Sequence, residues 1–174
     1  PALDLDADNS SGATGTGFAG TFTEGGGAVV VADADAILTD VDSATLTELV
    51  ATITNPLNGA AESLAANTSG TGISASYDSA TATLTLSGLD TVAHYQQVLR
   101  TITYDNSADN PGASSRIITF AASDGTDPGN TAIATVSVAA VNDAPVNSVP
   151  GAQSTNEDVP LVFSVANGNA ISIS

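Results

Sequence analysis

The sequence predicts an all-β fold, an antiparallel β-sandwich with one short crossover helix. Thr, Ser, Ala, Val and Ile dominate the 174 residues, in short runs that alternate between apolar and polar positions. Gly, Asn and Asp separate these runs, and short alternating strands with frequent turns are typical of a sandwich. One stretch, residues 90–99, instead has the spacing of a helix.

About seven short strands are expected in the first part of the chain. Thr83–Ser87 is the clearest, because Leu84 and Leu86 alternate with threonines and so lie on one face. Residues 77–81 are typical of a turn and join two strands as a hairpin. The expected strands are Val29–Val31, Leu46–Thr54, Ile73–Tyr77, Thr83–Ser87, Thr101–Tyr104, Ile117–Phe120 and Ala134–Val138.

Residues 90–99 predict the helix. Val92, Tyr95, Val98 and Leu99 recur at intervals of three and four residues, as one face of a helix requires. Asp90 is expected to cap the first turn, because Asp is a favoured residue at that position. The apolar side of this helix is expected to pack on the core where the chain crosses between strands.

The chain restarts near the segment Val141–Val146. Beyond it, Ser154–Glu157 repeats the pattern of Phe22–Glu24. Residues 1–143 are therefore expected to form one complete repeat, and residues 144–174 to form a linker and the first strands of a truncated next repeat. The strands expected in that second part are Leu161–Val165 and Ile171–Ser174.

The formal net charge is −17, from 15 Asp and 4 Glu against two arginines and no lysine. Nucleic acid and anionic membranes attract Lys and Arg, so neither nucleic acid binding nor direct membrane insertion is expected. Self-repulsion opposes compaction, yet the hydrophobic content of 42% is too high for a disordered chain. Bound cations would offset the self-repulsion and so allow a chain of this apolar content to fold. The absence of cysteine excludes disulfides and thiolate metal sites.

Paired aspartates in loops predict calcium sites. Asp40 and Asp42 form one Asp-x-Asp pair, and Asn142-Asp143 offers a second set of oxygen ligands. Ca²⁺ takes about six to eight oxygen ligands, whereas Mg²⁺ retains more waters. Zn²⁺ favours Cys and His, and this chain has only His94. The alternative is that these aspartates are solvated turn formers. Further acidic residues alternate in two other loops: Asp4, Asp6, Asp8, Asp33 and Asp35.

Three motifs, in the same order along the chain, resemble those of bacterial cadherin-like repeats, which occur in tandem in very large surface adhesins. Leu86–Asp90 is similar to the Leu-Asp-Arg-Glu segment of that family, and Phe120–Gly125 is similar to its Ala-x-Asp-x-Gly strand end. Val141–Pro145 resembles the linker between repeats. The resemblance covers most of residues 20–146, and it implies a Greek-key β-sandwich of the cadherin or immunoglobulin type.

The resemblance also implies that calcium is held between successive repeats. Val92 and Ala144 stand where the family pattern has Glu and Asn, so fewer ligands are expected than in animal cadherins. The implied ligands are Glu24, Asp90, Asn142 and Asp143 at the C-terminal end of the first repeat, and Asp40, Asp42 and Asp124 at its N-terminal end.

The expected function is structural: a calcium-binding repeat in the extended stalk of a bacterial surface adhesin that resembles RTX or type I-secreted adhesins. Ca²⁺ at the linkers between repeats would stiffen the stalk and so support cell adhesion and biofilm formation. The expected partners are neighbouring repeats of the same chain, with homophilic and host-surface or glycan contacts left open. The expected location is secreted or at the bacterial cell surface. The alternative is a ligand-binding module for a polysaccharide or a protein receptor.

No enzymatic activity is expected. Gly15–Gly20 matches a dinucleotide-binding fingerprint, but no apolar strand precedes it and no helical pattern follows. His94 has no recognisable serine nucleophile elbow to accompany it. A glycoside hydrolase would need an aromatic cleft beside its carboxylates, and only 4% of these residues are aromatic.

Overall fold

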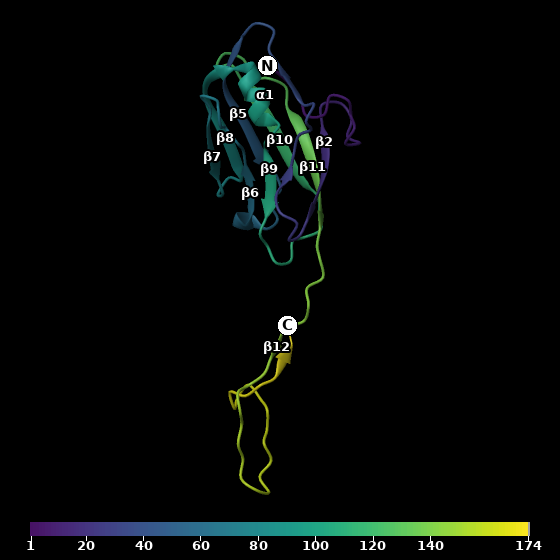
Figure 1. Ribbon diagram of the computed structural model, residues 1–174, viewed down its shortest axis with the longest axis vertical. Coiled ribbons are helices and arrows are strands. Elements are labelled where there is room, and N and C mark those ends of the chain that lie inside the picture. The colour runs from purple at the N-terminus through teal and green to yellow at the C-terminus, as the bar shows by residue number, and fades with distance from the viewer. Residues whose placement is uncertain (174) are drawn as a thin grey trace. The chain divides into compact units, whose positions relative to one another are not determined.

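The computed structural model describes residues 1–173. The chain forms two compact units, Pro1–Val141 and Asn142–Ser174. The division falls two residues before the boundary expected from the sequence. Strands make up 38% of the chain and helix 6%, so the chain is mostly β, as predicted. Figure 1 shows the first unit as layered sheets with α1 at one end.

The larger sheet of the first unit has the strand order β2-β11-β10-β5-β8-β7. Its neighbours are antiparallel, except that β11 and β2 run parallel. The predicted hairpin is confirmed, because β7 and β8 pair on either side of the turn after Asp78. The bounds are β2 Phe18–Thr23, β5 Thr45–Ile53, β7 Ser74–Asp78, β8 Thr83–Thr91, β10 Arg116–Ser123 and β11 Ala132–Ala139.

A three-stranded sheet, in the order β3-β9-β6, packs against the larger one (Figure 1). Its strands are β3 Val29–Val30, β6 Glu62–Ala65 and β9 Thr103–Asn106. Phe22 of β2 meets Tyr104 of β9 edge to face, with ring centroids 5.4 Å apart, so the core lies between the two sheets. The largest apolar side chains buried there include Leu49, Leu64, Leu84, Phe22, Phe120, Tyr95 and Tyr104.

The predicted helix is α1, Val92–Leu99, which follows β8 directly. A 3₁₀ turn, Gly59–Ala61, lies earlier in the chain, directly before β6. The prediction that Asp90 caps α1 is wrong. The cap is Thr91, whose Oγ1 accepts a hydrogen bond of 3.2 Å from the backbone N–H of His94. Tyr95, Val98 and Leu99 are buried, so the apolar face packs on the core as expected.

Another short antiparallel pair joins β1, Ala2–Asp4, to β4, Ile37–Thr39. Leu3 and Leu38 are partners in this pair, and both are 2% exposed. Their burial places the start of the chain against the core rather than leaving it to fray. The pair therefore fixes where the residues before β1 and after β4 lie.

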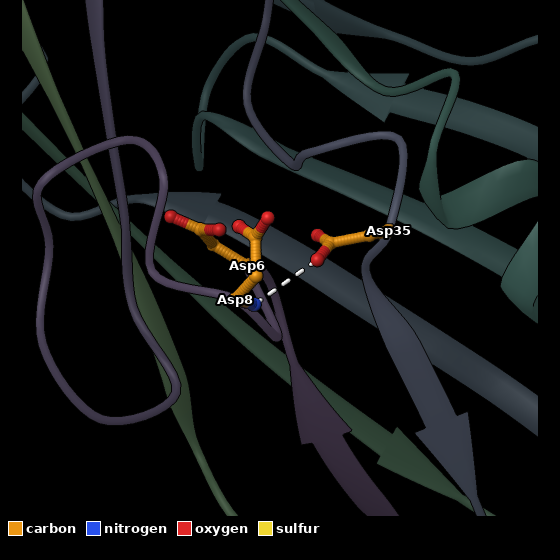
Figure 2. A group of neighbouring side chains, drawn as sticks. All are labelled: Asp6, Asp8 and Asp35. Carbon is orange, nitrogen blue, oxygen red and sulfur yellow. Dashed lines mark hydrogen bonds between the residues drawn. The ribbon is translucent and has the colours of Figure 1, made fainter.

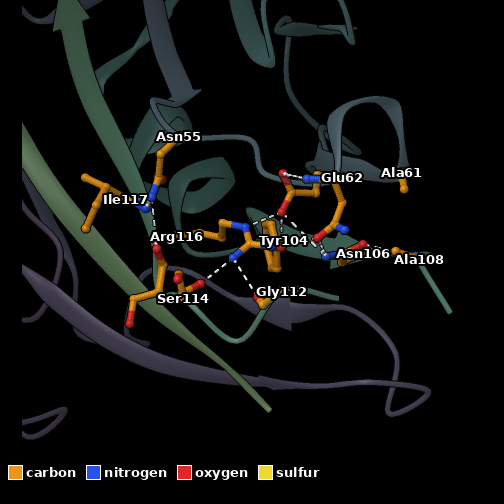
Figure 3. Close-up of polar contacts among 12 residues, drawn as sticks. Asn55, Ala61, Glu62, Tyr104, Asn106, Ala108, Gly112, Ser114, Arg116 and Ile117 are labelled. Carbon is orange, nitrogen blue, oxygen red and sulfur yellow. Dashed lines mark hydrogen bonds and ion pairs between the residues drawn. The ribbon is translucent and has the colours of Figure 1, made fainter. Parts of the chain in front are cut away.

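A buried polar network connects β6, β9 and β10 with the loops beside them (Figure 3). Arg116 Nε and Glu62 Oε1 form an ion pair, and both side chains are 0% exposed. Tyr104 donates to the same Glu62 oxygen at 2.9 Å, and Arg116 Nη2 donates to Asn58 Oδ1 at 2.7 Å. Burial, and then the hydrogen bond with Glu62, raises the pKa of Tyr104. The network thus satisfies charges that could not be buried alone.

The described residues of the second unit contain one antiparallel pair, β12 Asn147–Ser148 with β13 Ser172–Ile173. The prediction of a strand at Leu161–Val165 is wrong, because these residues are irregular and mostly exposed. A strand needs a neighbour to accept its backbone hydrogen bonds, and two strands alone are marginally stable. The strand expected at Ile171–Ser174 is reduced to β13, and Ser174 lies outside the described residues.

Candidate metal centre

Three aspartates from two loops meet at one end of the first unit. Asp40 follows β4 directly, Asp42 lies in the same loop, and Asp124 follows β10. Because Ser123 pairs with Glu48 near the start of β5, the loop after β10 and the loop before β5 leave the sheet at the same end. One carboxylate oxygen from each aspartate lies within 4.8 Å of the others. The resemblance implied that these three would gather, and they do.

Asp40 is the unusual member of this group, because its side chain is 0% exposed. Its Oδ1 accepts backbone hydrogen bonds from Asp42 at 3.2 Å and from Ser43 at 3.3 Å. Its Oδ2 is buried and accepts no hydrogen bond from any residue that the structure describes. The positive group beside that oxygen is the amino group of Pro1, at 3.4 Å. A buried carboxylate oxygen without a hydrogen bond is costly unless a cation compensates it.

The electrostatics of the three aspartates differ. Interaction with Asp42, and then backbone N–H groups of Asp42 and Ser43, lowers the pKa of Asp40 to about 2. The same carboxyl pairing raises the pKa of Asp42. Backbone N–H groups of Asp127 and Thr126 lower the pKa of Asp124. Neighbouring carboxylates that push one another's pKa apart are crowded like charges, and a cation among them would relieve the repulsion.

A second acidic group consists of Asp6, Asp8 and Asp35 (Figure 2). The sequence placed Asp6 and Asp8 in one loop and Asp35 in another, and it did not predict that the three converge. Hydrogen bonds from Ser11 are the largest influence on Asp6, and they lower its pKa although burial opposes the shift. Asp35 accepts from the backbone N–H groups of Ala7 at 3.2 Å and Asp8 at 3.0 Å. These carboxylates therefore organise the loop after β1.

The predicted placement of Asp90 beside Glu24 is wrong, because the two lie at opposite ends of the larger sheet. Asp90 pairs with Leu46 near the start of β5, at the Asp124 end. Glu24 follows β2, whose last residue pairs with Ala139 at the other end. The resemblance to a family motif gave Asp90 a role, but strand direction decides which end its side chain reaches.

Asp90 is held by donors of this chain. Its Oδ2 accepts from the backbone N–H of Gly72 at 2.6 Å, and its Oδ1 accepts from that of Thr91 at 2.7 Å. His94 Nδ1 lies 2.7 Å from the same Oδ1. The Gly72 and Thr91 hydrogen bonds are the main reason that the pKa of Asp90 is lowered. The carboxylate therefore fastens the loop before β7 to the start of α1.

Replacing Asp90 with Asn is expected to lower the melting temperature at pH 7 by several degrees. A lowered pKa means that the ionised carboxylate stabilises the fold above its ordinary value of 3.8, and that this contribution is lost as pH falls below it. Melting curves at pH 7 and pH 3 measure the effect, and the difference between the two proteins should be smaller at pH 3 than at pH 7. Asp105→Asn, with the same change in charge, is the control. An equal difference at both pH values would contradict the assignment.

At the opposite end, Glu24 Oε2 accepts a hydrogen bond of 2.7 Å from the backbone N–H of Val141. A carboxylate oxygen of Asp109 lies within 4.8 Å of one of Glu24. The sequence did not single out Asp109, since it stands alone in a loop 85 residues further along, with no paired carboxylate beside it. Asn142 and Asp143 belong to the second unit, where Asn142 Nδ2 donates to the Asp143 carbonyl at 3.1 Å. Their role as ligands stays a prediction.

Comparisons of the chain with protein-family models, with curated proteins and with solved structures gave no match. Among residues 1–173, no helix has the length and apolar character needed to cross a membrane.

Proposed function

We propose that the chain is a calcium-binding structural repeat from the extended stalk of a bacterial surface adhesin. In this proposal Asp40, Asp42 and Asp124 hold Ca²⁺ at one end of the first unit. The repeats would form Greek-key sandwiches of the cadherin type, and Ca²⁺ at their ends would stiffen the joints of the array. Such a rod would present the adhesin at the cell surface and support adhesion and biofilm formation.

The observation that carries the proposal is the buried Oδ2 of Asp40, which accepts no hydrogen bond from the described residues. It lies on an aspartate whose low pKa keeps it ionised at neutral pH. Exposed carboxylates on a protein surface need no cation, but a buried one without a hydrogen bond does. The oxygens of Asp42 and Asp124 lie within 4.8 Å and supply further ligands of the same kind.

The donor set favours calcium over other metals. All three side chains offer carboxylate oxygens, and backbone carbonyls and waters can complete the roughly six to eight ligands that Ca²⁺ takes. Zn²⁺ would favour nitrogen or sulfur ligands, and the group contains neither His nor Cys. When bound, Ca²⁺ would supply two positive charges to a chain whose net charge is −17, which reduces the self-repulsion of the folded state.

Isothermal titration calorimetry of the chelator-treated protein with CaCl₂ tests the proposal. We expect saturable binding, and we expect Asp40→Asn to weaken it by about tenfold or more, since it removes one charged ligand from the cation. Asp105→Asn, on β9 and outside the acidic group, changes the net charge equally and should bind like the unaltered chain. Equal affinity in the two variants would show that the cation is attracted by overall charge and not held by Asp40.

A further inference from the structure

The chain enters and leaves the first unit at opposite ends. Ala2 of β1 pairs with Thr39, the residue before Asp40, so β1 begins at the Asp40 end. Thr23 of β2 pairs with Ala139, the last residue of β11, at the other end. Figure 1 shows the chain leaving β11 at the end of the sheets away from α1. A pull on the chain from both sides of this unit therefore acts along its strands.

β2 and β11 form a parallel ladder that lies along this line of force. They pair over six residues, from Phe18 with Ala134 to Thr23 with Ala139. Because the strands run in the same direction, pulling β2 from its first residue and β11 from its last draws them past each other. The hydrogen bonds of the ladder then carry the load together, whereas strands opened from one end lose them one at a time.

Contacts at and beyond the strand ends reinforce this ladder. The backbone N–H of Glu24 donates to the Ala139 carbonyl at 3.0 Å, and Glu24 Oε2 accepts from the N–H of Val141 at 2.7 Å. Phe18 and Phe22 of β2 are buried in the core. β2 stands at the edge of the larger sheet, with β11 as its neighbour. Separation of these two strands is therefore the step that opens the unit under load.

The attachment of β1 is smaller. Three residues of β1 pair with β4, half the number in the β2–β11 ladder. Asn130 adds two hydrogen bonds to the backbone of Leu3, its Oδ1 accepting from the N–H at 2.6 Å and its Nδ2 donating to the carbonyl at 2.9 Å. Residues 5–17 separate β1 from β2, so a pull that detaches β1 first straightens this loop and then reaches β2.

We propose that the β2–β11 ladder is the force-bearing element of the first unit. Loaded in shear, it keeps the unit folded when the chain is pulled along its length, after β1 has yielded. The inference rests on the proposed function, because the stalk of an adhesin that holds a cell to a surface is under tension. The ladder itself consists of hydrogen bonds and core packing and does not involve Asp40, Asp42 or Asp124.

Pulling single molecules in two directions tests the proposal. The chain has no cysteine, so two introduced cysteines are the only points at which DNA handles for an optical trap attach. Thr16→Cys with Val141→Cys loads the ladder in shear, whereas Thr23→Cys with Val141→Cys opens the same ladder from one end. In a chelator and at one loading rate, we expect the first pair to unfold at several times the force of the second. Equal forces would overturn the proposal.

Matched truncations in the core locate the resistance. Val136 on β11, the partner of Gly20, and Val98 on α1 are both 0% exposed, so Val136→Ala and Val98→Ala remove the same atoms from buried sites. Both variants should lower the midpoint of urea denaturation. In the shear direction at constant force, only Val136→Ala should shorten the lifetime of the folded unit, by about three- to tenfold, because its contacts are lost on the way to the unfolding barrier. Equally shortened lifetimes would place the resistance outside the ladder and contradict the proposal.

The outcomes distinguish this inference from the proposed function. If the shear direction resists the greater force but the protein does not bind calcium, the calcium role fails and the force-bearing ladder stands. If calcium binds at Asp40 but the two directions resist equally, the ladder fails as the force-bearing element and the proposed function stands.

Discussion

Replacing Glu62 with Gln is expected to lower the free energy of unfolding by about 3–5 kcal/mol, the cost of leaving one member of a buried ion pair without its partner. The Arg116 guanidinium is 0% exposed, so it cannot recover solvation when the carboxylate is lost. Its other donors are already used, since Nη1 donates to Gly112 O at 3.0 Å and Nη2 to Asn58. The amide introduced by Glu62→Gln could still accept from Tyr104 but would carry no charge.

Urea denaturation of both single variants and of the double variant measures this coupling. Arg116→Met should cost about as much as Glu62→Gln, because it strands the opposite charge. Glu62→Gln combined with Arg116→Met should cost far less than the sum of the two single losses, since it leaves no buried charge and the glutamine can still accept from Tyr104. Additive losses would mean that the two side chains act independently, and would contradict an energetically coupled pair.

Arg100 provides the matched control for the loss of an arginine. Its Nε and Nη2 both donate to the Ala36 carbonyl, at 2.9 and 2.7 Å, and no described carboxylate forms an ion pair with it. Arg100→Met changes the net charge as Arg116→Met does but strands no buried charge. We therefore expect a smaller loss of stability from Arg100→Met than from Arg116→Met.

The strands with the clearest alternation, such as β8, could be predicted from the sequence, whereas β6 could not. Thr83–Ser87 lies within β8 and Ile117–Phe120 lies within β10. In both segments buried and partly exposed positions alternate, and the buried apolar residues are Leu84, Leu86, Ile118 and Phe120. Glu62–Ala65 was missed as β6, because its first buried residue is a glutamate that only the distant Arg116 makes tolerable. A charge pair separated by 54 residues leaves no local signal.

In the candidate site, too, some features could be predicted from the sequence and others could not. The Asp40-x-Asp42 pair is a local pattern, whereas the placement of Asp124 beside it was implied by the resemblance of Phe120–Gly125 to a family motif. Burial of Asp40 could not be, since it depends on the β1–β4 pairing and on Pro1. Asp90 was misplaced because a motif gives an expected role but not the end of the sheet at which the residue lies.

Calcium is expected to raise the melting temperature, and a chelator is expected to reverse the rise. At a free concentration 100 times the dissociation constant, a ligand that binds only the folded state adds about 2.7 kcal/mol. For a chain of this size that corresponds to roughly 5–11 °C. Because we expect Ca²⁺ to bind at Asp40, Asp42 and Asp124, Asp40→Asn should lose this rise in melting temperature. Asp105→Asn should retain it. NaCl at equal ionic strength controls for general screening of the −17 charge.

The pH dependence of the rise in melting temperature with calcium follows from the opposite pKa shifts of Asp40 and Asp42. Without metal, the lowered pKa of Asp40 gives stability that is lost as pH falls from 3.8 toward about 2. The raised pKa of Asp42 gives the opposite sign, stability that is lost as pH rises through that pKa. Ca²⁺ requires both carboxylates ionised. The difference in melting temperature with and without calcium should therefore be full at pH 7 and should shrink as pH falls through the raised pKa of Asp42. A difference that stays constant down to pH 3 would show that the stabilising ions do not bind at these carboxylates.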